Sequence, residues 1–354
     1  MQTAPSLTAL GKCPELGMEC AVGAIDQELR LLWQQDDART NASLMNLVVY
    51  SEKPGALQEN SAIVRDLTRE HACRAILVEI DRRERLAGIR AWVTAHCHLA
   101  HGQKTVCCEQ IAFYLTGVVT GRFRNTVFAH LNSDLPLVFW WRGELSDILT
   151  ERLVAVIDRL IVDSACWANP AASFDRIAKA ARSNSDLVLQ DHEWTRSWQF
   201  RVGLAGIFED AAAQQMLPDI ESVQIVHHPA HRNCALQLLA WLAEQAGWTD
   251  AGDGALAFRS RHGRPIRVDC MEDAAAPPVS SLVLRAGESC ASVQQAAGAT
   301  HVERSFESPG YRISSFGPAD PASPGELVGL QLARAGRNTL FHKILPRFKK
   351  LLAR

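Results

Sequence analysis

The stretch LMNLVVYSEKPGALQENSAIVRDLTREHACRAILVEI, residues 44–80, decides the class of fold. Residues 44–50 form an apolar run with the length of a buried strand, and residues 51–55 form a turn that contains Pro and Gly. Residues 56–71 repeat apolar side chains at helical spacing, and residues 75–80 return to an apolar run. A strand, a helix and a strand in this order predict a parallel pair with a right-handed crossover. We therefore expect an α/β fold.

The flanking sequence extends the same predicted sheet. Two strand candidates, residues 89–99 and 105–115, are joined by a polar turn and predict an antiparallel hairpin. The other elements predicted here are helices at 20–37, 121–131 and 145–158, and strands at 136–141 and 160–163. We expect an N-terminal mixed β-sheet whose helices come from β-α-β units.

In the second half of the chain the spacing of apolar residues changes from one segment to the next. Residues 191–209 predict an amphipathic helix. Its apolar face carries Trp194, Trp198, Val202, Ala205 and Phe208. After a strand at 223–226 and a helix at 232–247, apolar residues alternate with polar ones up to residue 316, between glycines and prolines. Such alternation is typical of antiparallel strands, so we expect a C-terminal α+β domain with an antiparallel meander, ended by helices at 324–335 and 338–352.

The chain is too long for one small core, because it has 354 residues. We expect a loose leader at 1–19, an N-terminal α/β domain at 20–168 and a C-terminal α+β domain at 169–354.

Composition narrows the class of partner. The formal net charge is -2, and the basic residues are spread among acidic ones. A concentrated basic surface, typical of nucleic-acid binding, is therefore not expected. We see no secretory signal and no apolar run of the ~18 residues that a membrane span requires. We expect a cytoplasmic protein with no nucleic-acid or membrane partner, whose ten cysteines are mostly reduced and buried.

The segment NSDLPLVFWWRG, residues 132–143, raises a specific question. Neighbouring side chains of a strand point to opposite faces, so Trp140 and Trp141 cannot enter the same core. The second ring lies either under a covering helix or against another protein. Tryptophan also stands near arginine at Trp141-Arg142, Trp194-x-Arg196 and Trp198 with Arg201. Tryptophan with arginine is a typical composition of an interface anchor, and core packing is the alternative.

Catalytic signatures are missing from the sequence. It contains no phosphate-binding G-x-x-x-x-G-K-[ST], no H-E-x-x-H and no G-x-S-x-G. His96-Cys97-His98-x-x-His101 followed by Cys107-Cys108 provides residue types that bind zinc. One alternative is therefore a metal-dependent enzyme that uses this cluster near residues 96–108. The purely structural alternative is a hairpin whose histidines are exposed and whose cysteines are buried. A third is a redox-sensitive set of thiols, Cys97, Cys107 and Cys108.

Four segments resemble one known family. Asn46-Leu47-Val48-Val49-Tyr50 with Arg74-Ala75-Ile76-Leu77-Val78 resembles its first β-α-β unit, and Asp134-x-Pro136-x-x-x-Trp140-Trp141 its most specific strand. Asp191-x-x-Trp194-x-Arg196 resembles a helix motif, with Phe200 where the family tends to have Trp. Leu340-Phe341-x-x-Ile344-Leu345 resembles the terminal Y-x-x-A-L helix, with Phe for Tyr and Ile for Ala. The chain resembles the OpcA family, known as glucose-6-phosphate dehydrogenase assembly proteins, over about residues 20–345.

The resemblance implies a non-catalytic cytosolic partner that promotes assembly or activity of glucose-6-phosphate dehydrogenase in the oxidative pentose phosphate pathway. It implies no cofactor, no metal and no catalytic residue. The residues that we expect at the partner interface are Trp140, Trp141, Arg142, Trp194, Arg196 and Arg201. For Trp194, Arg196 and Arg201 the alternative is that they hold their domain together.

Overall fold

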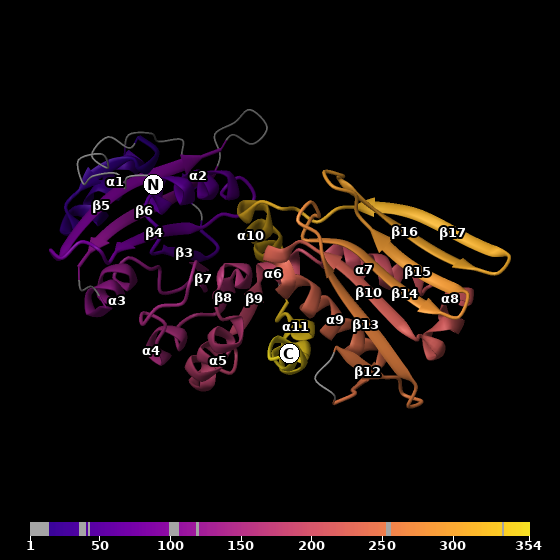
Figure 1. Cartoon of the computed structure of the whole chain (residues 1–354). Coiled ribbons are helices and arrows are strands. Elements are labelled where there is room, and N and C mark those ends of the chain that lie inside the picture. The colour runs from indigo at the N-terminus through magenta and orange to yellow at the C-terminus, as the bar shows by residue number, and fades with distance from the viewer. Residues whose placement is uncertain are drawn as a thin grey trace. The chain divides into compact units, whose positions relative to one another are not determined.

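The computed structural model describes residues 14–34, 40–41, 43–98, 106–117, 120–252, 256–334 and 336–354 (Figure 1). Residues 1–13 of the predicted leader lie outside the described residues. The chain divides into two compact units. The N-terminal unit comprises residues 1–168, 175–190 and 328–335, and the C-terminal unit comprises 169–174, 191–327 and 336–354. The division falls inside two helices, α5 (Pro170–Ala180) and α10 (Pro324–Ala333).

A mixed sheet forms the N-terminal unit, as predicted. Its strands lie in the order β1-β5-β6-β4-β3-β7-β8-β9, and β2 pairs with β6. The strands are β1 (Met18–Cys20), β2 (Thr40–Asn41), β3 (Asn46–Ser51), β4 (Arg74–Asp81), β5 (Gly88–Cys97), β6 (Val106–Thr116), β7 (Leu137–Arg142), β8 (Arg159–Val162) and β9 (Val188–Asp191). The central strand β3 pairs in parallel with β4 and with β7. The predicted hairpin of β5 and β6 is antiparallel.

The described helices of the N-terminal unit are α1 (Ile25–Gln34), α2 (Ala56–Leu67), α3 (Thr120–Phe128), α4 (Glu151–Val154) and part of α5. The helix predicted at 145–158 is wrong over most of its length, because only α4 is helical there. The Arg176 guanidinium donates hydrogen bonds of 2.7 Å to the carbonyl oxygens of Leu145 and Ser146, which would otherwise accept helical N–H groups.

The core of the N-terminal unit explains its apolar strands. Val49 of β3, Leu77 of β4 and Trp140 of β7 are buried in one cluster with Leu57 and Val64 of α2. All six residues of β3 are buried. Parallel strands covered on both faces need near-continuous apolar runs, and residues 44–50 show such a run.

The C-terminal unit contains the predicted meander with one change of order. Its sheet order is β11-β12-β13-β10-β14-β15-β16-β17. The strands are β10 (Ser222–His227), β11 (Thr249–Asp250), β12 (Ala257–Arg259), β13 (Pro265–Glu272), β14 (Val279–Ala286), β15 (Ser289–Gln294), β16 (His301–Ser308) and β17 (Tyr311–Pro318). Strands β14 to β17 are antiparallel neighbours in sequence order. Strand β10 lies between β13 and β14 and is parallel to β13, so the meander is not continuous.

The described helices of the C-terminal unit are α6 (His192–Thr195), α7 (Trp198–Ile207), α8 (Ala211–Met216), α9 (Arg232–Ala246) and α11 (Thr339–Leu352). The single helix predicted at 191–209 is therefore broken between α6 and α7. In this unit, α7 and α9 pack on the sheet, and α6 and α11 pack on α9 (Figure 1). Helix α7 contacts β15 and β16, and a Cβ added at Gly203 would lie 3.3 Å from Val293 and 3.4 Å from Arg304. None of the described helices is long and apolar enough to cross a bilayer.

Candidate functional site

The paired tryptophans occupy two different buried environments. Trp140 pairs with Val49 and joins the core under α2. Trp141 points to the opposite face, where its ring lies 4.3 Å from Tyr50 and 5.9 Å from Phe139. Phe123 of α3 completes this aromatic cluster, 5.4 Å from Tyr50. Trp140 and Trp141 are 1% and 0% exposed, so the second ring is also buried and the exposure required by an interface anchor is not found.

Arg142 is held by α2. Its guanidinium carbon lies 4.9 Å from the centre of the Trp140 ring, and one of its nitrogens donates 2.7 Å to Glu59. A second nitrogen donates to the Asn60 side chain. These contacts close the carboxyl end of β7 against the first turn of α2, and they leave the Arg142 side chain 19% exposed.

A carboxylate fills the N-terminus of α2. Glu79 of β4 is 3% exposed and accepts hydrogen bonds of 3.0 Å from the backbone N–H groups of both Gly55 and Leu57. Burial raises the pKa of Glu79, and the two N–H groups oppose that shift. Gly55, with φ of 77°, allows the chain to enter the helix at this point. Glu79 thus satisfies N–H groups that no helical carbonyl can reach.

The place of Glu79 at the N-terminus of α2 determines whether this sheet can bind a nucleotide in the usual way. In a doubly wound sheet, a dinucleotide places its pyrophosphate at the N-terminus of the helix that follows the first strand, where the strand order reverses. Here the order reverses between β3 and β7, and the helix that follows β3 is α2. Because Glu79 already occupies its N-terminus, the residues present do not fit a pyrophosphate.

A second polar cluster covers the same edge of the sheet. Arg82 pairs with Glu52 at 2.8 Å and also with Asp147. The Tyr50 hydroxyl donates to Glu52 and lies 3.2 Å from the Ser146 hydroxyl. Burial raises the pKa of Tyr50, which keeps its hydroxyl protonated. The loops after β3, β4 and β7 are therefore tied to one another by charges of the chain itself.

The segment Asp191 to Arg196 forms a buried polar cluster in the C-terminal unit. Glu193, 0% exposed, accepts hydrogen bonds of 2.8 Å from Arg196 and 3.0 Å from the Cys234 backbone N–H. His231 lies 2.8 Å from the same carboxylate. The Asp191 carboxylate accepts the Glu193 backbone N–H and the Gln237 side-chain amide. The cluster therefore fastens α6 to α9, which is a structural role.

Arg201 and Trp194 connect this polar cluster to helices α7 and α11. The Arg201 guanidinium lies over the Trp194 ring and donates 2.7 Å to the Trp194 carbonyl oxygen. On its other side the Trp194 ring lies near Phe341 of α11, 5.6 Å between ring centres. Trp194, Arg196 and Arg201 are 4%, 7% and 4% exposed. Five of the six residues predicted at the interface are thus buried, and their role in partner binding stays a prediction.

One tryptophan beside an arginine is exposed, and it is Trp198. Its side chain is 37% exposed at the start of α7, with Arg201 5.7 Å from its ring centre. Val202 is also 37% exposed, and Ala205 is exposed one turn further on. Spacings of four and three residues place Trp198, Val202 and Ala205 on one helix face, which we call the α7 stripe. The sequence placed these residues on the apolar face, but Phe200, Leu204 and Ile207 face the core instead.

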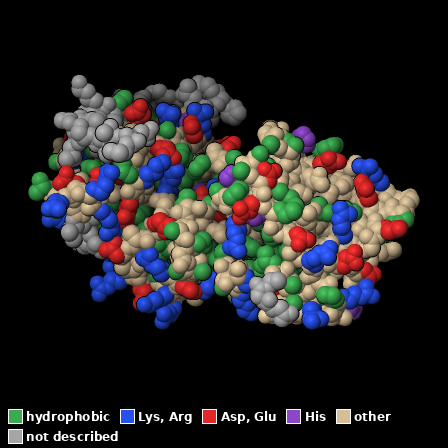
Figure 2. All heavy atoms as spheres, viewed as in Figure 1, with side chains coloured by type: hydrophobic (Ala, Val, Ile, Leu, Met, Phe, Trp, Pro, Cys, Tyr) green, Lys and Arg blue, Asp and Glu red, His purple; other side chains and the backbone are tan. Residues whose placement is uncertain are grey.

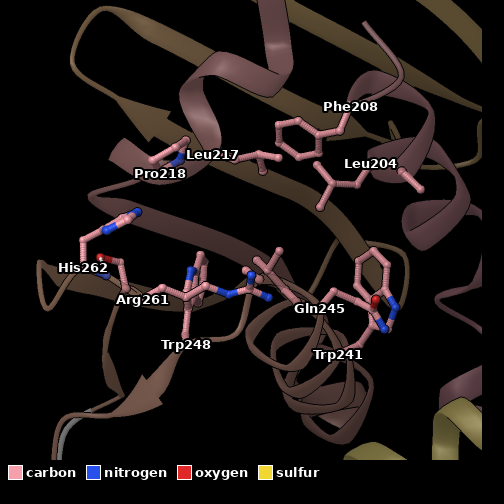
Figure 3. A pocket seen from close by; sticks show the side chains of 13 residues that line it. Leu204, Phe208, Leu217, Pro218, Trp241, Gln245, Trp248, Arg261 and His262 are labelled. Atoms are coloured by element: carbon pink, nitrogen blue, oxygen red, sulfur yellow. Dashed lines mark hydrogen bonds between the residues drawn. The ribbon is translucent and has the colours of Figure 1, made fainter. Parts of the chain in front are cut away.

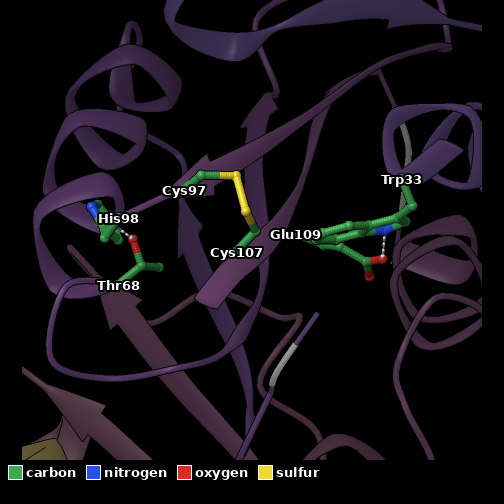
Figure 4. Close-up of a disulfide and its surroundings, with 6 residues drawn as sticks. All are labelled: Trp33, Thr68, Cys97, His98, Cys107 and Glu109. Carbon is green, nitrogen blue, oxygen red and sulfur yellow. Dashed lines mark hydrogen bonds between the residues drawn. A yellow bond between two sulfur atoms is a disulfide. The ribbon is translucent and has the colours of Figure 1, made fainter. Parts of the chain in front are cut away.

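The histidine–cysteine hairpin forms a disulfide instead of a metal site (Figure 4). Cys97 and Cys107 are direct partners in the β5–β6 register and are bonded to each other, so neither is a free thiolate ligand. The His96 ring lies 2.9 Å from the Gln110 amide oxygen, and the His98 ring 2.8 Å from the Thr68 hydroxyl. His101 lies outside the described residues. Within the described part of the chain no group of three His, Cys, Asp or Glu could hold a metal, and the disulfide removes Cys97 and Cys107 as ligands of the predicted cluster.

The third cysteine of the hairpin remains separate. Cys108 is buried, and burial raises the pKa of its thiol, which opposes formation of a reactive thiolate. The expectation of mostly reduced thiols misses the Cys97–Cys107 bond because spacing alone does not show that both residues face each other across a hairpin. A redox role for Cys97, Cys107 and Cys108 stays a prediction.

The surface charges are mixed. Figure 2 shows basic and acidic side chains interspersed over the face in view of both units. A single-sign field of the kind that attracts polyanions is not formed on that face.

Two signals for the site were present in the sequence and were missed. Glu79 interrupts the apolar run Ala75-Ile76-Leu77-Val78-Glu79-Ile80, and a carboxylate within a buried strand requires a hydrogen-bonding partner. The run Arg259 to Arg264 places three arginines and a histidine in six residues. It forms a turn beside an apolar hollow that is described below.

The fold and these clusters define an α/β protein with a doubly wound N-terminal sheet and a C-terminal α+β unit. The family model described as "Glucose-6-phosphate dehydrogenase subunit N-terminal domain" matches residues 64–179, and the corresponding C-terminal domain matches residues 188–345. The chain belongs to the OpcA family.

Two relatives carry the name OxPP cycle protein OpcA. The chain is 23% identical to that of Synechocystis sp. over 368 residues, which covers 96% of this chain and 77% of the relative. It is 26% identical to that of Nostoc punctiforme over 165 residues, which covers 46% of this chain and 35% of the relative.

Two solved structures are similar to this chain at low sequence identity. Aldose-aldose oxidoreductase from Caulobacter crescentus matches with a TM-score of 0.47 and 11% identity, over 88% of this chain and 97% of that chain. Myo-inositol dehydrogenase from Corynebacterium glutamicum matches with a TM-score of 0.42 and 11% identity, over 87% and 94%.

Proposed function

We propose that this chain is a non-catalytic factor that binds oligomeric glucose-6-phosphate dehydrogenase and favours its active state. Membership of the OpcA family is the observation that carries this proposal. The partner is glucose-6-phosphate dehydrogenase because the matching family models are described by that enzyme.

The N-terminal sheet edge supports a role without nucleotide chemistry. Glu79 fills the α2 N-terminus, and Arg142 and Arg82 are engaged in ion pairs along the same edge. Opening this edge to a dinucleotide would break those contacts and expose a buried carboxylate.

The α7 stripe supports a role in protein binding. Trp198 and Val202 expose apolar surface on a helix whose other face is packed on the sheet. An exposed tryptophan near an arginine is a common energetic centre of protein interfaces. In this proposal the buried residues Trp194 and Arg201 hold α7 in place from beneath.

The activating effect requires only a difference in affinity. A factor that binds the active state of an oligomer better than the inactive state shifts the population by that difference. A tenfold shift corresponds to about 1.4 kcal/mol.

Kinetics of the cognate dehydrogenase with and without this protein test the proposal. We expect a saturable increase in activity, together with a complex that elutes earlier than either protein in size-exclusion chromatography. Unchanged activity and separate elution at micromolar concentrations would exclude the proposed function.

A further inference from the structure

The C-terminal unit contains a hollow of about 500 Å³ with apolar walls (Figure 3). One wall consists of Leu204 of α7 and Phe208, which follows α7, with Leu217 and Pro218, which follow α8. The opposite wall consists of Trp241 and Gln245 of α9, with Trp248, Arg261 and His262. Ala205 of the α7 stripe also lines the hollow, so the exposed stripe leads directly into it.

The hollow is held open by packed residues. The Trp248 ring lies 6.0 Å from Phe258 of β12, and the Trp248 carbonyl oxygen accepts a hydrogen bond of 2.9 Å from Arg347. Leu204 is 1% and Trp241 8% exposed, so each is fixed by neighbours behind the wall. A pre-formed hollow of this size lies within the range of about 300–1,000 Å³ that is usual for binding pockets.

Arg261 lies beside the end of α9. Gly247 ends this helix with a φ of 67°, and a Cβ at this position would lie 2.2 Å from the Arg261 Nε atom. The glycine therefore leaves room for the guanidinium to lie across the end of the helix, at the rim of the hollow.

The charge of Arg261 is not neutralised by a neighbour. In the same turn Arg264 pairs with Asp219, and Arg259 donates 3.3 Å to the Gly263 carbonyl oxygen. Arg261 has neither an ion pair nor a hydrogen bond with any described residue, and its side chain is exposed. An apolar hollow with an unneutralised cation at its rim is complementary to an apolar group next to a carboxylate.

We propose that this hollow receives an acidic segment of the partner, with an apolar side chain between its walls and an Asp or Glu carboxylate at Arg261. The inference rests on the proposed function and deepens it by naming the docking surface. A protein segment fits better than a small molecule because the α7 stripe continues the apolar surface for two helical turns, about 10 Å, beyond the hollow. Arg261 provides orientation and attraction, and the walls provide most of the affinity.

Two substitutions separate these contributions. Ala205→Arg places a long side chain into the hollow from an exposed helical position and preserves the core. We expect it to weaken binding of glucose-6-phosphate dehydrogenase about 30-fold or more. Arg261→Glu should weaken binding about tenfold and reduce its dependence on salt concentration. Matched controls are Gln27→Arg on exposed α1 and Arg182→Glu, both in the other unit, which should bind like wild type.

Binding is measured by surface plasmon resonance on the immobilised dehydrogenase, with melting temperatures for every variant. If wild type binds but Ala205→Arg and Arg261→Glu bind equally well at wild-type melting temperature, the docking surface is wrong and the proposed function stands. If wild type fails to bind, the proposed function fails. Binding that is unaffected by both substitutions but accompanied by retention of a small anion in the purified protein would show that the hollow serves another ligand.

A cross-link identifies the acidic group. The Arg261→Lys variant keeps the charge and supplies an amine that a carbodiimide couples to a carboxylate in contact with it. We expect mass spectrometry to find an amide bond between position 261 and an Asp or Glu of the dehydrogenase. Cross-links that arise only from lysines elsewhere in a formed complex would contradict the proposal.

Discussion

The guanidinium carbon of Arg201 lies 3.4 Å from the centre of the Trp194 ring, and both residues are almost completely buried. This stacking, with the hydrogen bond to the Trp194 carbonyl oxygen, joins α7 to the segment that precedes it. Two residues that sequence alone placed at an interface are therefore part of the interior.

Replacing Arg201 should destabilise the C-terminal unit. Arg201→Ala removes the stacked cation and its donated hydrogen bonds, so we expect the free energy of unfolding to fall by about 2 kcal/mol or more. Arg201→Lys keeps the charge without the planar group and should cost less. Urea titration followed by circular dichroism measures both. The exposed control Arg182→Ala should stay within about 0.5 kcal/mol of wild type.

Trp141 distinguishes a core role from an interface role. Because its ring is fully buried beside Tyr50 and Phe139, we expect Trp141→Ala to lower the free energy of unfolding by about 3–5 kcal/mol. Trp141→Phe should lose less, because most of the ring remains. A melting temperature equal to wild type together with lost activation of the dehydrogenase would instead support an interface role.

Glu79 provides a test of the filled helix terminus. Glu79→Ala should leave the N–H groups of Gly55 and Leu57 without their acceptor, at a cost of about 1–2 kcal/mol. Inorganic phosphate should then raise the melting temperature of the variant more than that of wild type, because a vacated helix N-terminus attracts anions. Equal shifts in both proteins, measured by differential scanning fluorimetry against a sodium chloride control, would contradict this interpretation.

Because His96 is buried, we expect the stability of the folded protein to depend on pH. Burial lowers its pKa from the ordinary 6.5, so the folded state holds the neutral ring while the unfolded chain takes up a proton. The stability that results is complete above pH 6.5 and is lost as the pH falls through the lowered pKa. We expect the melting temperature to fall between pH 7.5 and 5.5, and to fall less steeply in His96→Gln. Parallel curves for the two proteins would exclude His96 as a source.

The Cys97–Cys107 disulfide predicts an effect of reduction. A bond across a separation of ten residues restricts the unfolded chain, so reduction should lower stability by about 2–3 kcal/mol. Dithiothreitol should lower the melting temperature of wild type but not of the double variant Cys97→Ser/Cys107→Ser. The exposed Cys166→Ser variant serves as a control that keeps the response. Activation of the dehydrogenase measured in both redox states tests whether the thiols also regulate binding.

The elements that sequence predicts well are those decided by local patterns. Strands β3 and β4 follow from continuous apolar runs, and the hairpin β12–β13 from alternation around His262 and Gly263. The insertion of β10 between β13 and β14 depends on pairing between distant strands, for which local spacing holds no signal. The helix expected at 145–158 is not formed over most of its length, and Arg176, far along the chain, donates hydrogen bonds to the carbonyl oxygens of Leu145 and Ser146, a contact that local spacing does not reveal.

The site was less predictable than the fold. Alternation correctly placed Trp140 and Trp141 on opposite faces, but it could not show that the second ring is buried beside Tyr50 and Phe139. Helical periodicity marked Trp198 and Val202 as apolar, yet their exposure depends on the break before α7, which moves the buried face to Phe200 and Leu204. The hollow requires side chains from α7, α9 and the turn at Arg261, which only the folded chain brings together.

Gly203 has a consequence for how the α7 stripe can bind. The helix backbone passes close to Val293 and Arg304 there, because an added Cβ would lie 3.3 Å and 3.4 Å from their side chains, which leaves α7 little room to shift. A partner would meet Trp198 and Val202 already in place, so association would require little ordering of the backbone. Substitutions on the stripe should then alter how long a complex lasts more than how fast it forms.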